Sequence, residues 1–270
     1  MASSNNNGSM LTFGGHLEVL RQMLFRILGV AGALAAVVFC FKDVTWNLLL
    51  APSEWNFCTY HWIESAMRAI GVADFYFDEF YVDLIATDLS SQFMTHITTA
   101  VYLGLLGASP YILFELFRFI SPALYESEKK YSVQAAAVIY LLFILGVLMS
   151  YFVLFPISFR FLGTYSVAER VHSTITLDSY VETFTTLTLV MGLVFQLPVI
   201  AFALAKMEFI SSNMLSKYRK HAFLIIMLVA AIITPPDLMT LILVTIPLYL
   251  LYELSIYIVK WVEKKNDVFE

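Results

Sequence analysis

The chain contains long runs of apolar residues that are almost free of charge and are separated by more polar segments. The runs are continuously apolar, with no alternation of apolar and polar positions, which favours helices over the strands of a membrane barrel. A bilayer core of about 30 Å takes roughly 20 residues of helix. Six runs of that order are found, at 24–41, 93–114, 133–155, 183–205, 222–233 and 238–259. The pattern predicts an all-α polytopic membrane protein with six transmembrane helices.

Composition agrees with a lipid environment, because 60% of the 270 residues are hydrophobic, 14% are charged and the mean hydropathy is +0.77. The net charge of -5 and the scattered basic residues argue against a nucleic-acid partner. The two cysteines and five histidines show no metal-binding spacing. We therefore expect no metal and no cofactor.

Charge also predicts the orientation. An even number of crossings puts both termini on one side, and basic residues gather on the cytoplasmic side of membrane proteins. The terminal side would hold most of the basic residues: Arg21, Arg26, Arg118, Lys129, Lys130, Lys206, Lys217, Arg219, Lys220, Lys260, Lys264 and Lys265. We expect a multi-pass protein of the inner membrane with cytoplasmic termini.

Three segments are expected along the chain. Residues 1–15 are polar at the start and predict a flexible N-terminal segment, residues 16–261 a single six-helix transmembrane domain, and residues 262–270 a cytoplasmic tail. A cleaved secretory signal is the main alternative for the first apolar run. No small-x-small cleavage site follows Phe41, which argues against it.

The longest outer connection, residues 42–91, is rich in aromatic residues, which favour the membrane interface. Within it, His61–Ile70 predicts a short interfacial helix that ends near Gly71. Its role is either to bind a substrate or to cap the bundle, and the cap is the favoured interpretation.

Three polar side chains lie within the apolar runs or at their ends. Glu115 has Arg118 three residues on, so a local ion pair is the favoured interpretation. Gln196 precedes Pro198, and its amide either bonds the backbone freed by that proline or reaches a partner helix. Glu253 is expected to snorkel or to pair with a lysine.

The turn between the last two runs contains Pro235 and Pro236, which end one helix, and Asp237, which can cap the next. The run before it, 222–233, is too short to span a bilayer core. We expect this hairpin to stop short of the outer surface and to thin the bilayer locally, or to be covered by outer loops.

Several short strings resemble, in order, the TatC family, the multi-spanning subunit of the twin-arginine translocase. The N-terminal string resembles the family's His-Leu-x-Glu-Leu-Arg signature, although Val19 stands at its glutamate and Glu18 lies one residue earlier. The other strings resemble the family's first cytoplasmic loop, the end of its third helix and its later helices. The matching residues are His16–Arg21, Pro110, Phe119–Tyr125 with Pro122, Glu128–Lys130, Tyr151–Pro156, Phe195–Pro198, Thr234–Asp237, Pro247–Tyr249 and Glu253.

The resemblance implies a receptor for paired-arginine signal peptides of folded proteins, exported by the proton-motive force. It implies Glu128 as the signal-binding carboxylate, with Phe119 lining the same site and Glu18 as a second carboxylate. Guanidinium groups pair well with carboxylates, which suits this role. Single-span Tat partners of the TatA or TatB type would complete an oligomeric complex, with Gln196 as a contact to their helices.

Two other classes of function remain open from the residues alone. An ion-coupled small-molecule transporter would need charged sites at the bilayer midplane and inverted repeats. A membrane-embedded enzyme would need a catalytic constellation, and no nucleophile with an oriented base is apparent. We expect no enzymatic activity.

Overall fold

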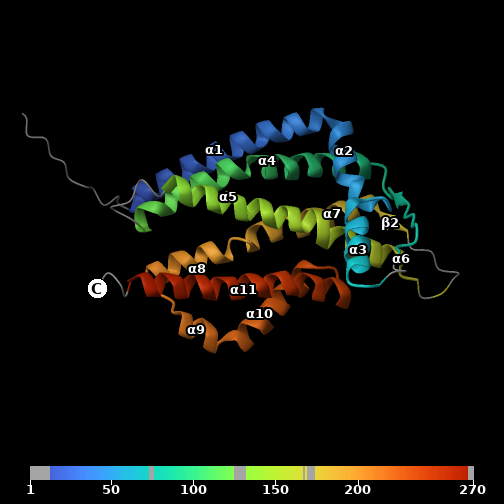
Figure 1. The fold of residues 1–270 in the computed structure, drawn as a ribbon. Coiled ribbons are helices and arrows are strands. Elements are labelled where there is room, and N and C mark those ends of the chain that lie inside the picture. The colour runs from blue at the N-terminus through green and yellow to red at the C-terminus, as the bar shows by residue number, and fades with distance from the viewer. Residues whose placement is uncertain (1–12, 73–75, 125–131, 167, 169–173, 267–270) are drawn as a thin grey trace, which may run out of the picture.

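The computed structural model describes residues 13–72, 76–124, 132–166, 168 and 174–266. Long helices run roughly side by side and form a bundle (Figure 1), and the predicted all-α fold class is confirmed. The long elements are α1 (Phe13–Cys40), α4 (Ser91–Leu124), α5 (Ser132–Met149), α6 (Phe155–Thr164), α7 (Leu177–Val194), α8 (Leu197–Lys206), α10 (Arg219–Ile233) and α11 (Leu238–Asn266).

Length and composition identify the membrane spans. Among the described residues, five helical spans are long and apolar enough to cross a bilayer: 17–40, 91–116, 136–164, 177–206 and 238–264. The remaining predicted run forms α10, whose 15 residues cover about 22 Å at 1.5 Å per residue. Because that is less than the bilayer core of about 30 Å, α10 is a short membrane helix, as its sequence predicted.

Several predicted helix ends were wrong, and two of these errors concern helices that continue past a proline. The second helix continues ten residues past 114, so that α4 ends at Leu124 and includes Pro110 and Pro122. The third continues past Pro156 as α6, because a π-helical turn, η2 (Ser150–Leu154), precedes the proline and takes up the extra backbone. Both extensions show that proline ends a membrane helix less reliably than it ends a soluble one.

The fourth predicted span consists of α7 and α8 with a break between them. The Thr176 side chain accepts a hydrogen bond from the Ser179 N–H at 3.2 Å and caps the start of α7. Pro198 lies in the first turn of α8, where its missing N–H needs no partner. A short helix, α9 (Ser212–Lys217), then leads to α10.

A small-residue contact joins α1 closely to α4. A Cβ atom added at Gly104 would lie 2.6 Å from the backbone nitrogen of Ala35. One turn later on α4, a Cβ atom at Gly107 would meet only the Leu34 Cδ1 atom at 3.7 Å, an ordinary contact. Gly104 is therefore the position where the two backbones approach most closely, as small residues permit in membrane helices.

A cap of short elements covers the end of the bundle away from the described ends of the chain (Figure 1). It contains α2 (Lys42–Leu50), the 3-10 turn η1 (Ala51–Ser53), α3 (Cys58–Ala69), and two short parallel strands, β1 (Leu84–Ile85) and β2 (Ile175–Thr176). The predicted short helix is confirmed as α3, and Gly71 follows it with φ at +97°; the place of α3 at the membrane interface stays a prediction. The favoured structural role of the cap rests on its packing against the membrane spans.

Buried hydroxyl groups tie the cap to the spans. Tyr60 of α3 is 1% exposed and donates a hydrogen bond to the Pro156 carbonyl at 2.9 Å. Tyr180 of α7 donates to the Leu49 carbonyl at 2.7 Å. Burial raises the pKa of Tyr60, so its hydroxyl keeps the proton that it donates.

A half-buried cation lies beneath the cap. The Arg160 guanidinium carbon lies 4.4 Å from the centre of the Phe77 ring and 4.8 Å from that of Phe80, and its Nη2 donates to the Asp78 carbonyl at 3.0 Å. Arginine over aromatic faces is a stabilising arrangement. The Phe77 N–H in turn donates to the Glu64 carboxylate at 2.9 Å, which lowers the pKa of Glu64.

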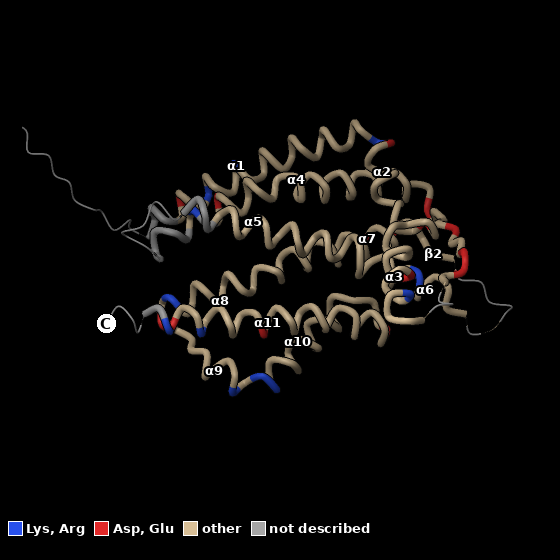
Figure 2. The backbone as a smooth tube through the Cα atoms, viewed as in Figure 1, with Lys and Arg blue, Asp and Glu red and all other residues tan. Residues whose placement is uncertain are grey.

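Charges lie mostly at the two ends of the bundle. Figure 2 shows Lys, Arg, Asp and Glu at these ends and at the corner of α9 and α10, with few along the helices between them. The start of α1 and the end of α11 lie at one end, and acidic residues follow the loops at the capped end. This arrangement agrees with the six-helix prediction.

Candidate functional site

The uncapped end of the bundle gathers the first turns of α1 and the last turns of α4. Glu18 lies on the exposed surface of α1, where the Arg21 Nη2 atom is 2.8 Å from the Glu18 Oε1 atom. Gln22 also donates to that oxygen, at 3.1 Å. Glu18 is therefore an exposed carboxylate whose partners, Arg21 and Gln22, lie about one turn away on the same helix.

Glu115 carries the buried negative charge of this end. Its side chain is 7% exposed, its Oε1 atom lies 3.3 Å from the Arg26 Nη1 atom, and the Tyr111 hydroxyl donates to the same oxygen at 3.2 Å. The expected local pair with Arg118 was wrong. A partner on the neighbouring helix α1 reaches Glu115 instead, so the ion pair fastens α1 to α4.

Phe119 lies one helical turn after Glu115 on α4, and residues four apart share a face of a helix. Its side chain is half-buried. Phe119–Leu124 was expected in a loop by family resemblance, but these residues continue α4. The helix therefore presents an aromatic side chain at its charged end. Glu128, the leading carboxylate candidate, lies outside the described residues.

Gln196 lies at the break between α7 and α8. Its Nε2 atom donates to the Ile139 carbonyl of α5 at 3.2 Å and to the Gly192 carbonyl at 3.4 Å. The amide thus bonds the backbone of its own helix and that of the neighbouring helix α5 in the same chain. Its contact with a partner subunit stays a prediction. The Oε1 atom is buried and has no hydrogen-bond partner among the described residues.

The hairpin between α10 and α11 contains the predicted N-terminal cap of helix α11. The Asp237 Oδ1 atom accepts a hydrogen bond from the Thr240 N–H at 2.7 Å, one turn into α11. Pro235 and Pro236 stand between the last residue of α10 and this cap. The capping role of Asp237 is therefore confirmed, and its second oxygen, Oδ2, is buried with no partner in the described part of the chain.

Glu253 is paired, but with an arginine and not with the expected lysine. Its Oε2 atom lies 2.9 Å from the Arg219 Nη2 atom, and the Tyr249 hydroxyl donates to its Oε1 atom at 3.1 Å. Its side chain is 25% exposed. The ion pair joins the first residue of α10 to the second half of α11.

Sequence reasoning missed one polar cluster near the capped end. The Asp178 carboxylate accepts hydrogen bonds from the Ser91 and Thr95 hydroxyls, and so connects the first turns of α7 and α4. The predicted run began at residue 183, whereas α7 begins at Leu177 with Asp178 in its first turn, so no signal in the sequence marked this cluster. Its partners lie more than 80 positions earlier, and single-sequence patterns do not pair residues at that distance.

Comparisons with known proteins match almost the whole chain. The profile of the TatC family, described as Sec-independent protein translocase protein, matches residues 15–247. A TatC protein of Blattabacterium is 34% identical over 97% of this chain and 99% of its own length. A TatC protein of Carboxydothermus hydrogenoformans is 31% identical over 95% of this chain and 96% of its own.

A crystal structure described as the twin arginine translocase receptor TatC superposes with a TM-score of 0.73 at 28% identity, covering 92% of this chain and 99% of that one. The agreement in fold and in sequence excludes the small-molecule transporter and the membrane-embedded enzyme. The chain therefore belongs to the TatC family and is the receptor subunit of a twin-arginine translocase, a multi-pass transport component and not an enzyme.

Proposed function

We propose that this receptor binds paired-arginine signal peptides at the uncapped end of the bundle, with Glu128 as the principal carboxylate and Phe119 and Glu18 beside it. A guanidinium fork pairs with a carboxylate in two charge-assisted hydrogen bonds, which an amine cannot reproduce. An aromatic side chain beside it can stack on the guanidinium or pack on apolar residues of the signal.

The observation that carries the proposal is the ion pair between Arg26 of α1 and Glu115 of α4. It fixes the helix that carries Glu18 against the helix that carries Phe119 and that precedes the Glu128 segment. A recognition site gains affinity when its parts are held in place before the ligand arrives. The proposed orientation, with both termini in the cytoplasm, puts this end where a signal peptide first meets the inner membrane.

A matched pair of variants in the same segment tests the proposal. Glu128→Gln removes the proposed carboxylate, whereas Glu126→Gln removes a carboxylate two residues away. Because a hydrogen bond to a charged group contributes about 1.5–3 kcal/mol, we expect Glu128→Gln to weaken binding of a paired-arginine peptide about tenfold or more. Binding is measured by co-purification and crosslinking to the full chain.

The control peptide carries two lysines in place of the two arginines and should bind weakly to every variant. Glu126→Gln should bind the paired-arginine peptide as the parent does. Equal binding by the parent and by Glu128→Gln would place the carboxylate site elsewhere, with Glu18 as the next candidate.

Partner subunits form the second part of the proposal. We propose that single-span Tat subunits of the TatA or TatB type assemble with this chain in an oligomer, driven in export by the proton-motive force, and that Gln196 contacts their helices. The place of a half-buried amide side chain in an apolar span supports this role, because an amide in lipid is best satisfied across a helix interface. Gln196→Leu should reduce co-purification of the partners while signal binding stays unchanged, and unchanged partner recovery would remove Gln196 from the interface.

The hairpin is proposed as a functional element. A short α10 thins the bilayer beside it, since a short hydrophobic span draws the lipid surfaces together at fractions of a kcal/mol per Å. We propose that this thinning, set by Pro235, Pro236 and Asp237, lowers the barrier to opening a path for folded cargo.

A further inference from the structure

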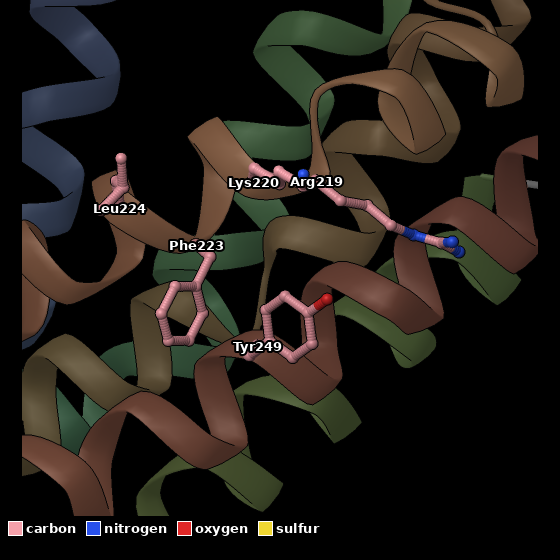
Figure 3. A pocket seen from close by; sticks show the side chains of 5 residues that line it. All are labelled: Arg219, Lys220, Phe223, Leu224 and Tyr249. Carbon is pink, nitrogen blue, oxygen red and sulfur yellow. The ribbon is translucent and has the colours of Figure 1, made fainter.

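A pocket of about 390 Å³ opens between the first turns of α10 and the middle of α11. It is separate from the proposed signal site on α1 and α4. Its lining combines two cations with apolar and aromatic side chains: Arg219, Lys220, Phe223, Leu224 and Tyr249 (Figure 3). Such a lining suits an amphipathic ligand, with a charged group at one end and an apolar part beside it.

The cations are not fully neutralised. Glu253 pairs with one edge of the Arg219 guanidinium, whose side chain stays 46% exposed, and a guanidinium carries five N–H donors. Among the described residues, no carboxylate lies within 4.0 Å of the Lys220 amine. Arg219, Lys220 and Glu253 together leave a net positive charge at the pocket. An anionic group is therefore the ligand end that this charge favours.

The apolar wall lies beside these cations. The Phe223 and Tyr249 rings pack edge to face with centroids 5.6 Å apart. Leu224 follows on α10 and is 64% exposed. Inorganic phosphate gains nothing from such a wall. A phospholipid presents both a phosphate and acyl chains, and so matches the whole lining.

The depth of the pocket also fits a headgroup. Glu253, which holds Arg219, lies seven residues before Lys260 on α11, or about 10 Å along the helix. In the proposed orientation Lys260 and Lys264, in the last turns of α11, lie at the membrane surface. Arg219 and Lys220 thus lie below that surface, where long basic side chains extend toward phosphate groups.

We propose that this pocket binds an anionic phospholipid of the leaflet on the terminal side. The phosphate binds Lys220 and the free edge of Arg219, and an acyl chain packs on Phe223 and Leu224. Bound there, the lipid joins the first turn of the short helix α10 to α11. The proposal depends on the chain being a membrane protein and not on the signal-binding role of Glu128.

The experiment uses the full chain in phosphatidylcholine nanodiscs or micelles, with phosphatidylglycerol added as the anionic probe. Lys220→Gln removes a pocket cation but keeps the Arg219–Glu253 ion pair, and Lys260→Gln removes a cation of the same kind outside the pocket. Lys220→Arg keeps the charge. Retained lipid is measured by native mass spectrometry, and the unfolding midpoint by thermal denaturation.

We expect phosphatidylglycerol to bind in preference to phosphatidylcholine, and Lys220→Gln to weaken that binding about fivefold. Lys260→Gln and Lys220→Arg should bind as the parent does. Equal binding of the two lipids, or equal losses in Lys220→Gln and Lys260→Gln, would overturn the proposal. Displacement of phosphatidylglycerol by millimolar inorganic phosphate would also overturn it, because the pocket would then be a site for free phosphate.

Discussion

The ion pair between Arg26 and Glu115 predicts an unequal response to two charge-removing substitutions. Arg26→Gln leaves the Glu115 carboxylate buried with the Tyr111 hydroxyl as its remaining partner. Glu115→Gln leaves Arg26 without this ion pair, but the Arg26 side chain is 48% exposed on the surface of the bundle and is long enough to extend toward the headgroups. Because a carboxylate held inside the bundle cannot leave its site whereas a long arginine side chain can snorkel to phosphate groups, Arg26→Gln should destabilise the protein more.

The magnitude follows from burial. Breaking a fully buried ion pair costs about 3–5 kcal/mol. Arg26 is half-exposed and Tyr111 still donates one hydrogen bond, so we expect about 2 kcal/mol for Arg26→Gln. Glu115→Gln keeps an oxygen that accepts from Tyr111 and should cost below about 1 kcal/mol. At roughly 2–4 °C per kcal/mol, Arg26→Gln should lower the unfolding midpoint by about 4–8 °C.

The assay is thermal unfolding of purified protein in one detergent, for the parent, both single variants and the double variant Arg26→Gln/Glu115→Gln. The double variant should regain part of the stability lost in Arg26→Gln, since it no longer buries a charge. A loss in Glu115→Gln as large as that in Arg26→Gln, with no recovery in the double variant, would refute the assignment of Arg26 as the counterion.

Three further predictions concern packing, the hairpin and topology. Gly104→Ala should cost about 1–3 kcal/mol in thermal unfolding, because the added Cβ would lie 2.6 Å from the Ala35 backbone, whereas Gly107→Ala, one turn away, should cost little. Equal costs would contradict this close approach. Inserting four apolar residues after Ile232 lengthens α10 by about one turn and should slow export while signal binding persists. Export at the parental rate would show that the short span is not functional. Cys58, in the first turn of α3, should react with a membrane-impermeant thiol reagent added from outside, and Cys58→Ser, which keeps Cys40, should not. Labelling only from the cytoplasmic side of inverted vesicles would reverse the proposed orientation.

Continuous apolar runs were sufficient to locate the spans, because lipid requires a spanning backbone to satisfy its own hydrogen bonds and a continuously apolar run does so as a helix. They were insufficient at Pro156, since the π-helical turn that carries the chain past this proline depends on packing and leaves no periodic signal. The two-residue strands β1 and β2 are likewise too short to show a pattern.

Polar residues were predictable where their partners are local. Asp237 caps the helix that directly follows it, and its role was read from sequence. Glu115 and Glu253 bind arginines 89 and 34 positions away, so the nearest basic residues gave the wrong partners. The role of Glu128 rests on family resemblance and stays a prediction.

The arginine held beneath the cap constrains how the protein is made. Phe77 and Phe80 are synthesised about 80 residues before Arg160, the cation that their rings cover. At roughly 5–20 residues per second, the ribosome takes about 4–16 s to make the intervening chain. In the proposed orientation, the first outer loop crosses the bilayer during that interval, while its aromatic residues still lack the cation that they later cover. The cap can therefore be completed only after the third span has been made and inserted. Truncated chains that end before residue 160 should expose this loop to protease added from outside.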